Sequence, residues 1–212
     1  MLPDPASLAR AAAAFLTERA RASVAAAGAF RLAVSGGRTP WEMFAELSGE
    51  DVPWPEVVIY QVDERVCPAA DPGRNLGHLE MALGSAPAEV RPMPVEGADL
   101  DAAAADYAAS LPPRLDVVHL GLGPDGHTAS LVPGDPVLEV TDRLVALTGP
   151  YQGHRRMTLT YQGLARARQL LWLVSGADKR DALSRLLDGD GSIPAGRVEA
   201  EASLVMADQA AT

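Results

Sequence analysis

The chain has 212 residues, 48% of them hydrophobic and 22% charged, and a formal net charge of −10 at pH 7. This length and composition predict one folded domain, residues 1–212, and exclude an intrinsically disordered chain. The negative charge argues against a general nucleic-acid-binding protein and against a protein that binds anionic membranes, so we expect no partner of either kind. An anionic ligand would need a locally positive pocket.

The cysteine content and the lack of long apolar runs indicate where the protein acts. Cys67 is the single cysteine, so it cannot form a disulfide within the chain, and one thiol does not make a cysteine-rich zinc site. The alanine-rich residues 1–30 lack a basic leading region and contain Glu18 and Arg19, so we interpret them as a helix of the mature protein rather than a targeting segment. No uncharged apolar run approaches the length of a transmembrane helix. These features predict a cytoplasmic protein.

The first half of the chain alternates predicted helices and strands. Residues 7–27 have the composition of a helix, which Gly28 can end. Thr39 is placed to cap the next helix, with Pro40 in its first turn and Gly49 at its end. The other elements predicted in this half are strands over 30–37 and 56–65 and helices over 75–84 and 99–111.

The second half continues the alternation. A strand over 114–123 leads into the loop sequence GLGPDGHTASLVPG, residues 121–134. The elements that follow are extended segments over 142–149 and 155–165, a strand over 168–176, a helix over 177–189 and a strand over 201–208. Apolar strands that alternate with helices predict a doubly wound α/β domain with a mostly parallel sheet and helices on both faces.

Four polar stretches fall at the predicted ends of strands. In doubly wound sheets ligands bind outside the carboxyl ends of the strands, where loops and helix N-termini converge. We therefore expect these stretches to share one cleft. They are SGGRTP at 35–40, VDER at 62–65, GLGPDGHTAS at 121–130 and SGADK at 175–179.

The stretch SGGRTP has the parts of an anion-binding loop. Glycine lets the backbone approach a phosphate, and the amides at the start of the following helix favour negative charge. The sequence is neither a Walker motif nor a dinucleotide fingerprint, so nucleotide binding is not indicated. The alternative is a tight turn with an ordinary helix cap. The candidate ligand-binding residues here are Ser35, Gly36, Gly37, Arg38 and Thr39.

Two cations could complete such an anion site. Lys179 lies near the start of a predicted helix, where the helix dipole opposes a positive charge, so this placement calls for an anionic partner. Arg156 precedes an extended run and could reach the same pocket as a bidentate phosphate donor. The alternative for Lys179 is a solvated surface side chain, and we expect Arg155 to face solvent.

The stretch VDER places Asp63, Glu64 and Arg65 directly after an apolar strand. These side chains could pair with one another. Alternatively, they present hydrogen-bond acceptors and one cation to a polar ligand.

The glycine-bounded loop contains Asp125 and His127 two residues apart. Histidine suits general acid-base chemistry because its ordinary pKa is about 6.5, and a nearby carboxylate could fix its tautomer. The four histidines show no pair at metal-binding spacing, so we expect no metal and no cofactor. His119 lies inside an apolar strand and is expected to be a core residue with satisfied hydrogen bonds. Ser130 lacks a nucleophile-elbow sequence, which argues against a serine nucleophile.

These motifs, in their order and approximate spacing, resemble the 6-phosphogluconolactonase family. The resemblance runs from Val34 to the final MADQAA, and the histidine loop is its most specific part. The motifs that carry it are SGGRTP, VDERVCP with Asn75 downstream, GLGPDGHTASLVPG, RRMTLT, VSGADKRDAL and IPAGRV. Three positions depart from the usual pattern of that family, namely Arg74, Val132 and Arg155.

The resemblance implies a fold like that of glucosamine-6-phosphate deaminase and the hydrolysis of 6-phospho-D-glucono-1,5-lactone to 6-phosphogluconate, a step of the oxidative pentose phosphate pathway. A lactone hydrolase needs a positioned water, a base and charge stabilisation, without a metal or a covalent intermediate. The catalytic residues would be His127 as base, Asp125 to orient it, and Arg65 or loop amides to stabilise the oxyanion. The substrate-binding residues would be Ser35, Gly36, Gly37, Arg38, Thr39, Asp63, Glu64, Asn75, Gly123, Gly126, Arg156 and Lys179, with Asp63, Glu64 and Asn75 in sugar contacts or loop bracing.

Two alternatives remain at this point. One is a sugar-phosphate isomerase or deaminase on the same scaffold, although Ser130, Leu131 and Val132 stand where the deaminase loop carries its acidic helper, and Arg65 stands where the deaminase has tyrosine. The other is a non-catalytic sugar-phosphate-binding module. The expected partner is a small phosphosugar lactone, and a monomer is the working expectation for the oligomeric state.

Overall fold

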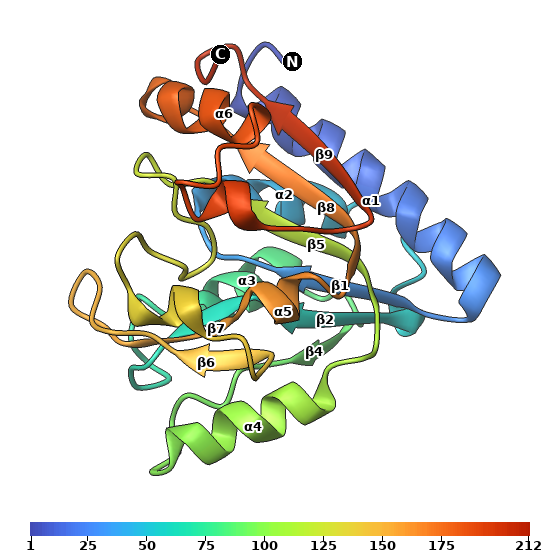
Figure 1. Cartoon of the computed structure of the whole chain (residues 1–212). Helices are drawn as coiled ribbons and strands as arrows, with labels where there is room; N and C mark the ends of the chain where they lie inside the picture. Colours follow the sequence, from blue (N-terminus) through green and yellow to red (C-terminus); the bar gives the residue numbers. More distant parts are fainter.

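Six strands form the central sheet of the computed structural model, which describes all 212 residues (Figure 1). Their order is β4-β2-β1-β5-β8-β9, and every neighbouring pair is parallel. The predicted doubly wound α/β fold is confirmed. The strands are β1 (Phe30–Val34), β2 (Val57–Gln61), β4 (Glu89–Arg91), β5 (Leu115–Gly121), β8 (Ala167–Val174) and β9 (Ala202–Ala207).

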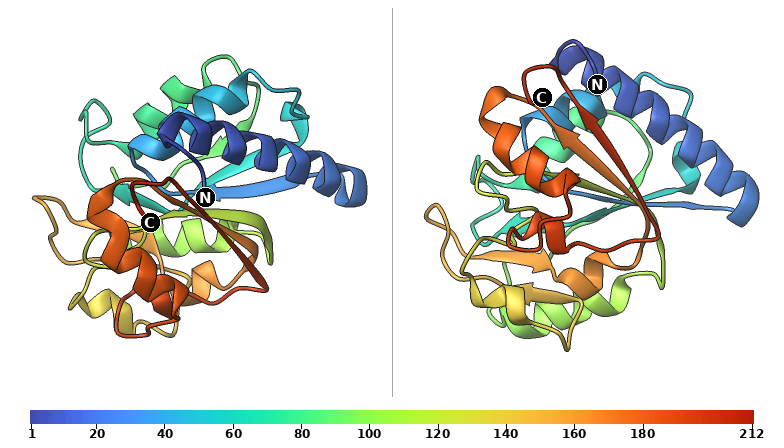
Figure 2. Two further views of the ribbon diagram at one scale, coloured as in Figure 1. Left: turned by 90° about the horizontal axis from the view of Figure 1, so that it is seen from above. Right: turned by 45° about the horizontal axis from the view of Figure 1, so that its top comes forward.

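Helices cover both faces of this sheet, because its strands are apolar on both sides. One group of buried side chains joins the sheet to α1 (Pro5–Ala27), α2 (Arg38–Ser48) and α3 (Asn75–Leu83). A second group joins the opposite face to α4 (Leu100–Ser110), α5 (Tyr161–Leu164) and α6 (Arg180–Leu187). The view from above shows these layers on either side of the strands (Figure 2).

A small antiparallel sheet lies beside the carboxyl ends of the main strands. It consists of β3 (Asp63–Arg65), β7 (Arg156–Leu159) and β6 (Val145–Leu147), in the order β3-β7-β6. The strand predicted over 56–65 is therefore two strands. Val62 is the point of divergence, since its amide bonds back to Val34 in the main sheet while its carbonyl accepts from Leu159 in the small one.

The ends of helices follow from individual residues, with one correction. Asp4 caps α1 by accepting from the Ser7 amide at 2.7 Å, and Gly28 ends it in the left-handed conformation at φ +72°. The prediction that Thr39 caps the second helix is wrong. α2 begins at Arg38 with Gly37 as its N-cap, so Thr39 lies within the first turn.

Two further differences concern short elements. β4 was not predicted, because its three residues include the exposed Glu89 and Arg91 and offer no apolar run. Tyr161–Leu164 was predicted as extended but forms one helical turn, which Thr160 caps by accepting from Gly163. The single-turn helices are η1 (Trp54–Glu56), η2 (Pro136–Glu139), η3 (Ala177–Lys179) and η4 (Ala195–Arg197).

The strand order determines where loops meet. The chain runs outward from β1 through β2 to β4 and then returns to place β5 on the other side of β1, so the order reverses between β1 and β5. Ligands bind at such a switch point. The loops after β1 and β5 are therefore neighbours, flanked by the loops after β2 and β8. No helix in this fold combines the length and the apolarity that crossing a bilayer requires.

Candidate active site

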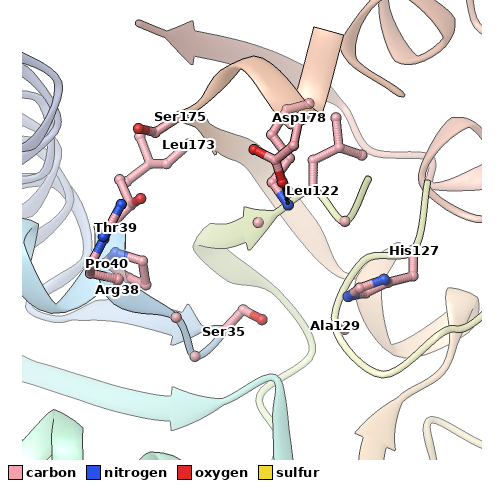
Figure 3. Close-up of a pocket in the computed structure, with 15 residues that line it drawn as sticks. Ser35, Arg38, Thr39, Pro40, Leu122, His127, Ala129, Leu173, Ser175 and Asp178 are labelled. Carbon is pink, nitrogen blue, oxygen red and sulfur yellow. Dashed lines mark ion pairs between the residues drawn. The ribbon is translucent and has the colours of Figure 1, made fainter. Parts of the chain in front are cut away.

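The four polar stretches meet in one cleft with two adjoining arms. Figure 3 shows the larger arm, with Ser35 and His127 on opposite sides of it. The arms have volumes of about 490 Å³ and 290 Å³, close to the range of roughly 300–1,000 Å³ typical of small-molecule sites. Both arms are lined by Ser35, Gly36, Gly37, His127, Ala129 and Lys179. We call the larger one the helix arm, lined in addition by Arg38, Thr39, Pro40, Gly121, Leu122, Gly123, Leu173, Ser175 and Asp178. The smaller one, the hairpin arm, is lined in addition by Asp63, Arg65, Asn75, Pro124, Tyr151, Gln152 and Arg156.

The floor shared by both arms contains free backbone donors. The amides of Gly36 and Gly37 donate to no group of the protein, and they precede the N-terminus of α2, whose dipole favours an anion. A side chain does not fit at Gly36, since a Cβ there would lie 2.1 Å from Oδ1 of Asn75. The close approach of Asn75 fixes the path of this loop.

Four cations line the cleft although the chain as a whole is negative. Arg65 and Arg156 are register partners on β3 and β7, so their side chains start side by side. Lys179 lies on η3 and pairs with Asp178 at 3.1 Å, and Arg38 makes no ion pair. This cluster supplies the locally positive pocket that an anionic ligand needs.

Arg156 is the most buried of these cations, with 5% of the residue exposed. Its Nε has no hydrogen-bond partner, and its Nη2 reaches Oε1 of Gln152 only at 3.5 Å. Burial lowers the pKa of Arg156, and the nearby Asp63 opposes this effect only in part. A buried guanidinium without a carboxylate partner is suited to bind an anion that enters the cleft.

His127 faces both arms, and 22% of its side chain is exposed. Its Nδ1 lies 2.5 Å from Oδ1 of Asp125, and the His127 amide donates to the same oxygen at 3.1 Å. Burial alone would raise the pKa of Asp125, but the hydrogen bonds from the amide and the ring of His127 outweigh it and hold that pKa below its usual value. The carboxylate therefore stays charged and fixes the ring, leaving Nε2 free to act.

Gly123 and Gly126 of the histidine loop are required for different structural reasons. A Cβ at Gly123 would lie 2.1 Å from Nδ1 of His127 and 2.7 Å from Oδ1 of Asp125, so glycine makes room for the pair. Gly126 does not line the cleft, contrary to its expected place among the ligand contacts. It has φ +82°, packs against Ile193 and accepts from the Ala195 amide at 2.9 Å, so the motif IPAGRV supports this loop from behind.

The carboxylate of Asp63 ties the loops together. Its two oxygens accept from Oγ of Ser35 at 3.1 Å and from Oγ of Ser130 at 2.7 Å, and it is 5% exposed at the edge of the hairpin arm. Asn75 adds a bond to the Asp63 carbonyl at 3.0 Å and accepts from Arg65 at 2.7 Å. The glycine loop and the histidine loop are thus fixed relative to each other.

Glu64 does not line the cleft either, and of the two roles expected for it, a sugar contact or loop bracing, its contacts fit bracing. It is fully buried and accepts from the Asn75 and Leu76 amides, both at 2.8 Å, at the N-terminus of α3. Arg74 faces Glu64 at 3.3 Å and Glu96 at 2.8 Å. The unusual Arg74 therefore braces α3 from outside the cleft, and Arg155 is exposed as expected.

Tyr151 forms an aromatic side of the hairpin arm that was not predicted from the sequence. The ring of Tyr151 lies 5.6 Å from that of His127, edge to face at 66°, and 4.9 Å from the Arg156 guanidinium. The segment GPYQGH carries no recognisable motif, so no sequence signal pointed to it. Gln152 was likewise found only from the structure, whereas Ser175 and Asp178 belong to the predicted stretch SGADK although neither was singled out as a ligand-binding residue.

His119 is a core residue, as predicted, but its hydrogen bonds are not satisfied. It is fully buried on β5, and neither ring nitrogen has a partner. Burial lowers its pKa to about 3, so the ring is neutral. It lines neither arm of the cleft.

Comparisons with known proteins identify the family and support the fold. The sequence profile of the family described as "Glucosamine-6-phosphate isomerases/6-phosphogluconolactonase" matches residues 3–206. A 6-phosphogluconolactonase of Mesorhizobium japonicum is 38% identical over 206 residues, covering 92% of this chain and 84% of that protein. The crystal structure of a 6-phosphogluconolactonase from Shewanella baltica superposes with a TM-score of 0.85 at 28% identity, covering 98% of this chain and 95% of that one.

A third relative shows how far the fold extends. A monomeric glucosamine-6-phosphate deaminase has a TM-score of 0.85 at 18% identity, covering 99% of this chain and 96% of that one. The fold is therefore common to proteins with different reactions, and only the site can distinguish them.

Proposed function

The chain belongs to the family of glucosamine-6-phosphate isomerases and 6-phosphogluconolactonases, and we propose that it hydrolyses 6-phospho-D-glucono-1,5-lactone to 6-phosphogluconate. One observation carries this proposal. An imidazole held by a carboxylate and a cationic loop with free amides face the same cleft, which is what hydrolysis of a phosphorylated lactone requires.

The base is His127. A neutral ring that donates Nδ1–H to Asp125 has its lone pair on Nε2, which can take a proton from water. The water oxygen then bonds to C1 of the lactone, and the carbonyl electrons move to oxygen. When the bond between C1 and the ring oxygen breaks, the imidazolium returns the proton to that oxygen, so atoms and charge balance. Arg65 or a loop amide stabilises the oxyanion.

The 6-phosphate binds between the glycine loop and the cations. The free amides of Gly36 and Gly37 donate to it, and Arg156 and Lys179 balance its charge. A dianion held here would satisfy the unpartnered Nε of Arg156. Because the 6-phosphate is distant from the reacting carbon, its binding energy can be used to hold the lactone carbonyl in a fixed orientation relative to His127.

We propose a cytoplasmic monomer that uses no metal or cofactor and acts in the oxidative pentose phosphate pathway. The single Cys67 is free and has no partner for a disulfide, which fits a reducing compartment. Light scattering at assay concentration tests the monomer, which a mass near the 22.2 kDa of the chain would support.

A coupled assay tests the reaction itself. Freshly made 6-phosphogluconolactone is supplied with a 6-phosphogluconate dehydrogenase, and turnover is measured above spontaneous hydrolysis. Turnover supports the proposal. Ammonia released from glucosamine 6-phosphate without lactone turnover would indicate a deaminase, and ligand binding without any turnover would indicate a binding module.

A further inference from the structure

A hairpin over residues 148–156 overhangs the site. Thr148 and Arg156 pair at its base, through an amide-to-carbonyl bond of 2.8 Å and a bond of 3.1 Å from the Arg156 amide to Oγ1 of Thr148. Near its tip, Tyr151 and His154 exchange bonds of 2.9 Å and 3.2 Å. Gln152 and Gly153 have φ of 51° and 85°, as a type I′ turn requires. The backbone of Tyr151 is therefore fixed by pairing.

The side chain of Tyr151 contacts two groups that the proposed mechanism uses for different tasks. Its ring meets the imidazole of His127 edge to face, with centroids 5.6 Å apart. The guanidinium of Arg156 lies over the same ring, 4.9 Å from its centroid. One aromatic side chain thus joins the base to the phosphate-binding cation.

Neither group has many other restraints. The ring of His127 has one hydrogen bond within the protein, from Nδ1 to Asp125, and its other edge faces the cleft. Arg156 has an unpartnered Nε and a bond of 3.5 Å to Gln152. The hydroxyl of Tyr151 makes only a 3.4 Å contact with Gln152, so the ring rather than the hydroxyl provides the restraint.

We propose that Tyr151 is a positioning residue that orients the imidazole of His127 and the guanidinium of Arg156 through its ring. This inference rests on the proposed lactonase reaction. Edge-to-face and cation-π contacts of this kind favour particular orientations of both partners. Loss of the ring should affect turnover through His127 and substrate affinity through Arg156.

Kinetics of ring-removing and ring-retaining variants test this inference. We expect Y151L and Y151Q each to lower kcat and to raise KM for the phosphorylated lactone, both by about three- to tenfold. Y151F should keep both constants within about twofold of the wild type, because the ring remains. Two ring-removing variants are used so that one can be measured if the other folds poorly, as judged by circular dichroism and Tm.

The chain offers a matched control in Tyr161. This tyrosine also carries an arginine over its ring, Arg197 at 4.7 Å, but it lies outside the cleft. Y161L should lower Tm, because its ring packs under Arg197 and its hydroxyl donates to the Pro194 carbonyl at 3.2 Å, and it should change kcat and KM much less than Y151L does. A change in Y161L as large as that in Y151L would show that the kinetic effect is general destabilisation, and it would overturn the inference.

H127A is measured in parallel to separate the two proposals. Ring-removing variants with wild-type constants beside an inactive H127A would overturn the positioning role and leave the lactonase proposal intact. A Y151F as impaired as Y151L would also overturn it, because the hydroxyl would then be the acting group. A wild type without lactone turnover would remove the proposed function and this inference with it.

Discussion

Arg156 and His119 are both buried and both carry side-chain nitrogens without a hydrogen-bond partner, Nε in Arg156 and the two ring nitrogens in His119. Their surroundings differ. Arg156 borders the cleft, so a ligand can satisfy it. His119 lies in the middle of the sheet, where nothing from solvent can reach it, and it must stay neutral. We therefore expect replacement of Arg156 to weaken ligand binding and replacement of His119 to change the stability of the fold.

Replacing Arg156 by methionine should raise KM for 6-phosphogluconolactone by at least about tenfold, since charged hydrogen bonds contribute roughly 1.5–3 kcal/mol. The constants for unphosphorylated gluconolactone should change little. R155M is the matched control, because Arg155 is the exposed neighbour of the same strand end. Equal KM values for R156M and the wild type would exclude Arg156 from the phosphate site.

His119 predicts how stability varies with pH. Its pKa is lowered to about 3 in the folded protein, against about 6.5 in an unfolded chain. The unfolded state therefore binds the extra proton, so the stability contributed by the neutral ring is complete above about pH 6.5 and is lost as pH falls toward 3. H119L should show a smaller drop in Tm between pH 7.5 and 5 than the wild type. The exposed-site variant H78Q should keep the wild-type drop, and an unchanged drop in H119L would contradict the assignment.

At the scale of elements, the loop after β5 holds His127, the proposed base, beside Asp125 only because Gly123 leaves space for the pair. G123A should displace either the ring of His127 or Asp125, and we expect kcat to fall on the order of a hundredfold, the typical loss of a general base. G77A is the control, since a Cβ there meets nothing within 4 Å and the residue lies on α3 away from the cleft. A wild-type kcat in G123A would contradict this expectation, because it would show that catalysis tolerates a displaced His127 or Asp125.

The sequence predicted these elements where a local pattern determines them. Apolar runs predicted β1, β2, β5, β8 and β9, and the polar stretches after β2, β5 and β8 bring Asp63, His127 and Lys179 to one cleft, as expected. The direction in which each side chain points could not be predicted from local sequence patterns. Glu64 lies between two cleft residues yet turns inward to α3, and Tyr151 belongs to the site only because the small sheet carries its hairpin back over His127. Such facts depend on tertiary contacts.

At the scale of the molecule, the two sheets share one core. Buried side chains of the small sheet, such as Met157 and Leu159, belong to the same cluster as Leu120 and Trp172 of the main sheet. The two ends of the chain are also joined, since the Leu2 amide donates to the carbonyl of Ala207, the last residue of β9, at 2.9 Å. Figure 2 shows both ends of the chain at the same side of the molecule.

This shared core predicts that residues 1–212 unfold as one domain. Urea denaturation followed by tryptophan fluorescence and by far-ultraviolet circular dichroism should give coincident transitions. Trp172 reports on one core cluster and Trp41 and Trp54 on the cluster of the opposite face, whereas dichroism reports on all helices. Two separate midpoints would show that part of the chain folds independently.

The central claim is that His127 activates water for attack on a lactone held in this cleft. The most direct measurement is kcat of H127A beside the wild type in the coupled lactone assay, corrected for spontaneous hydrolysis, with Tm as the check on folding. The account predicts a kcat lower by on the order of a hundredfold or more at a wild-type Tm. An H127A protein that folds normally and turns over the lactone at the wild-type rate would contradict it.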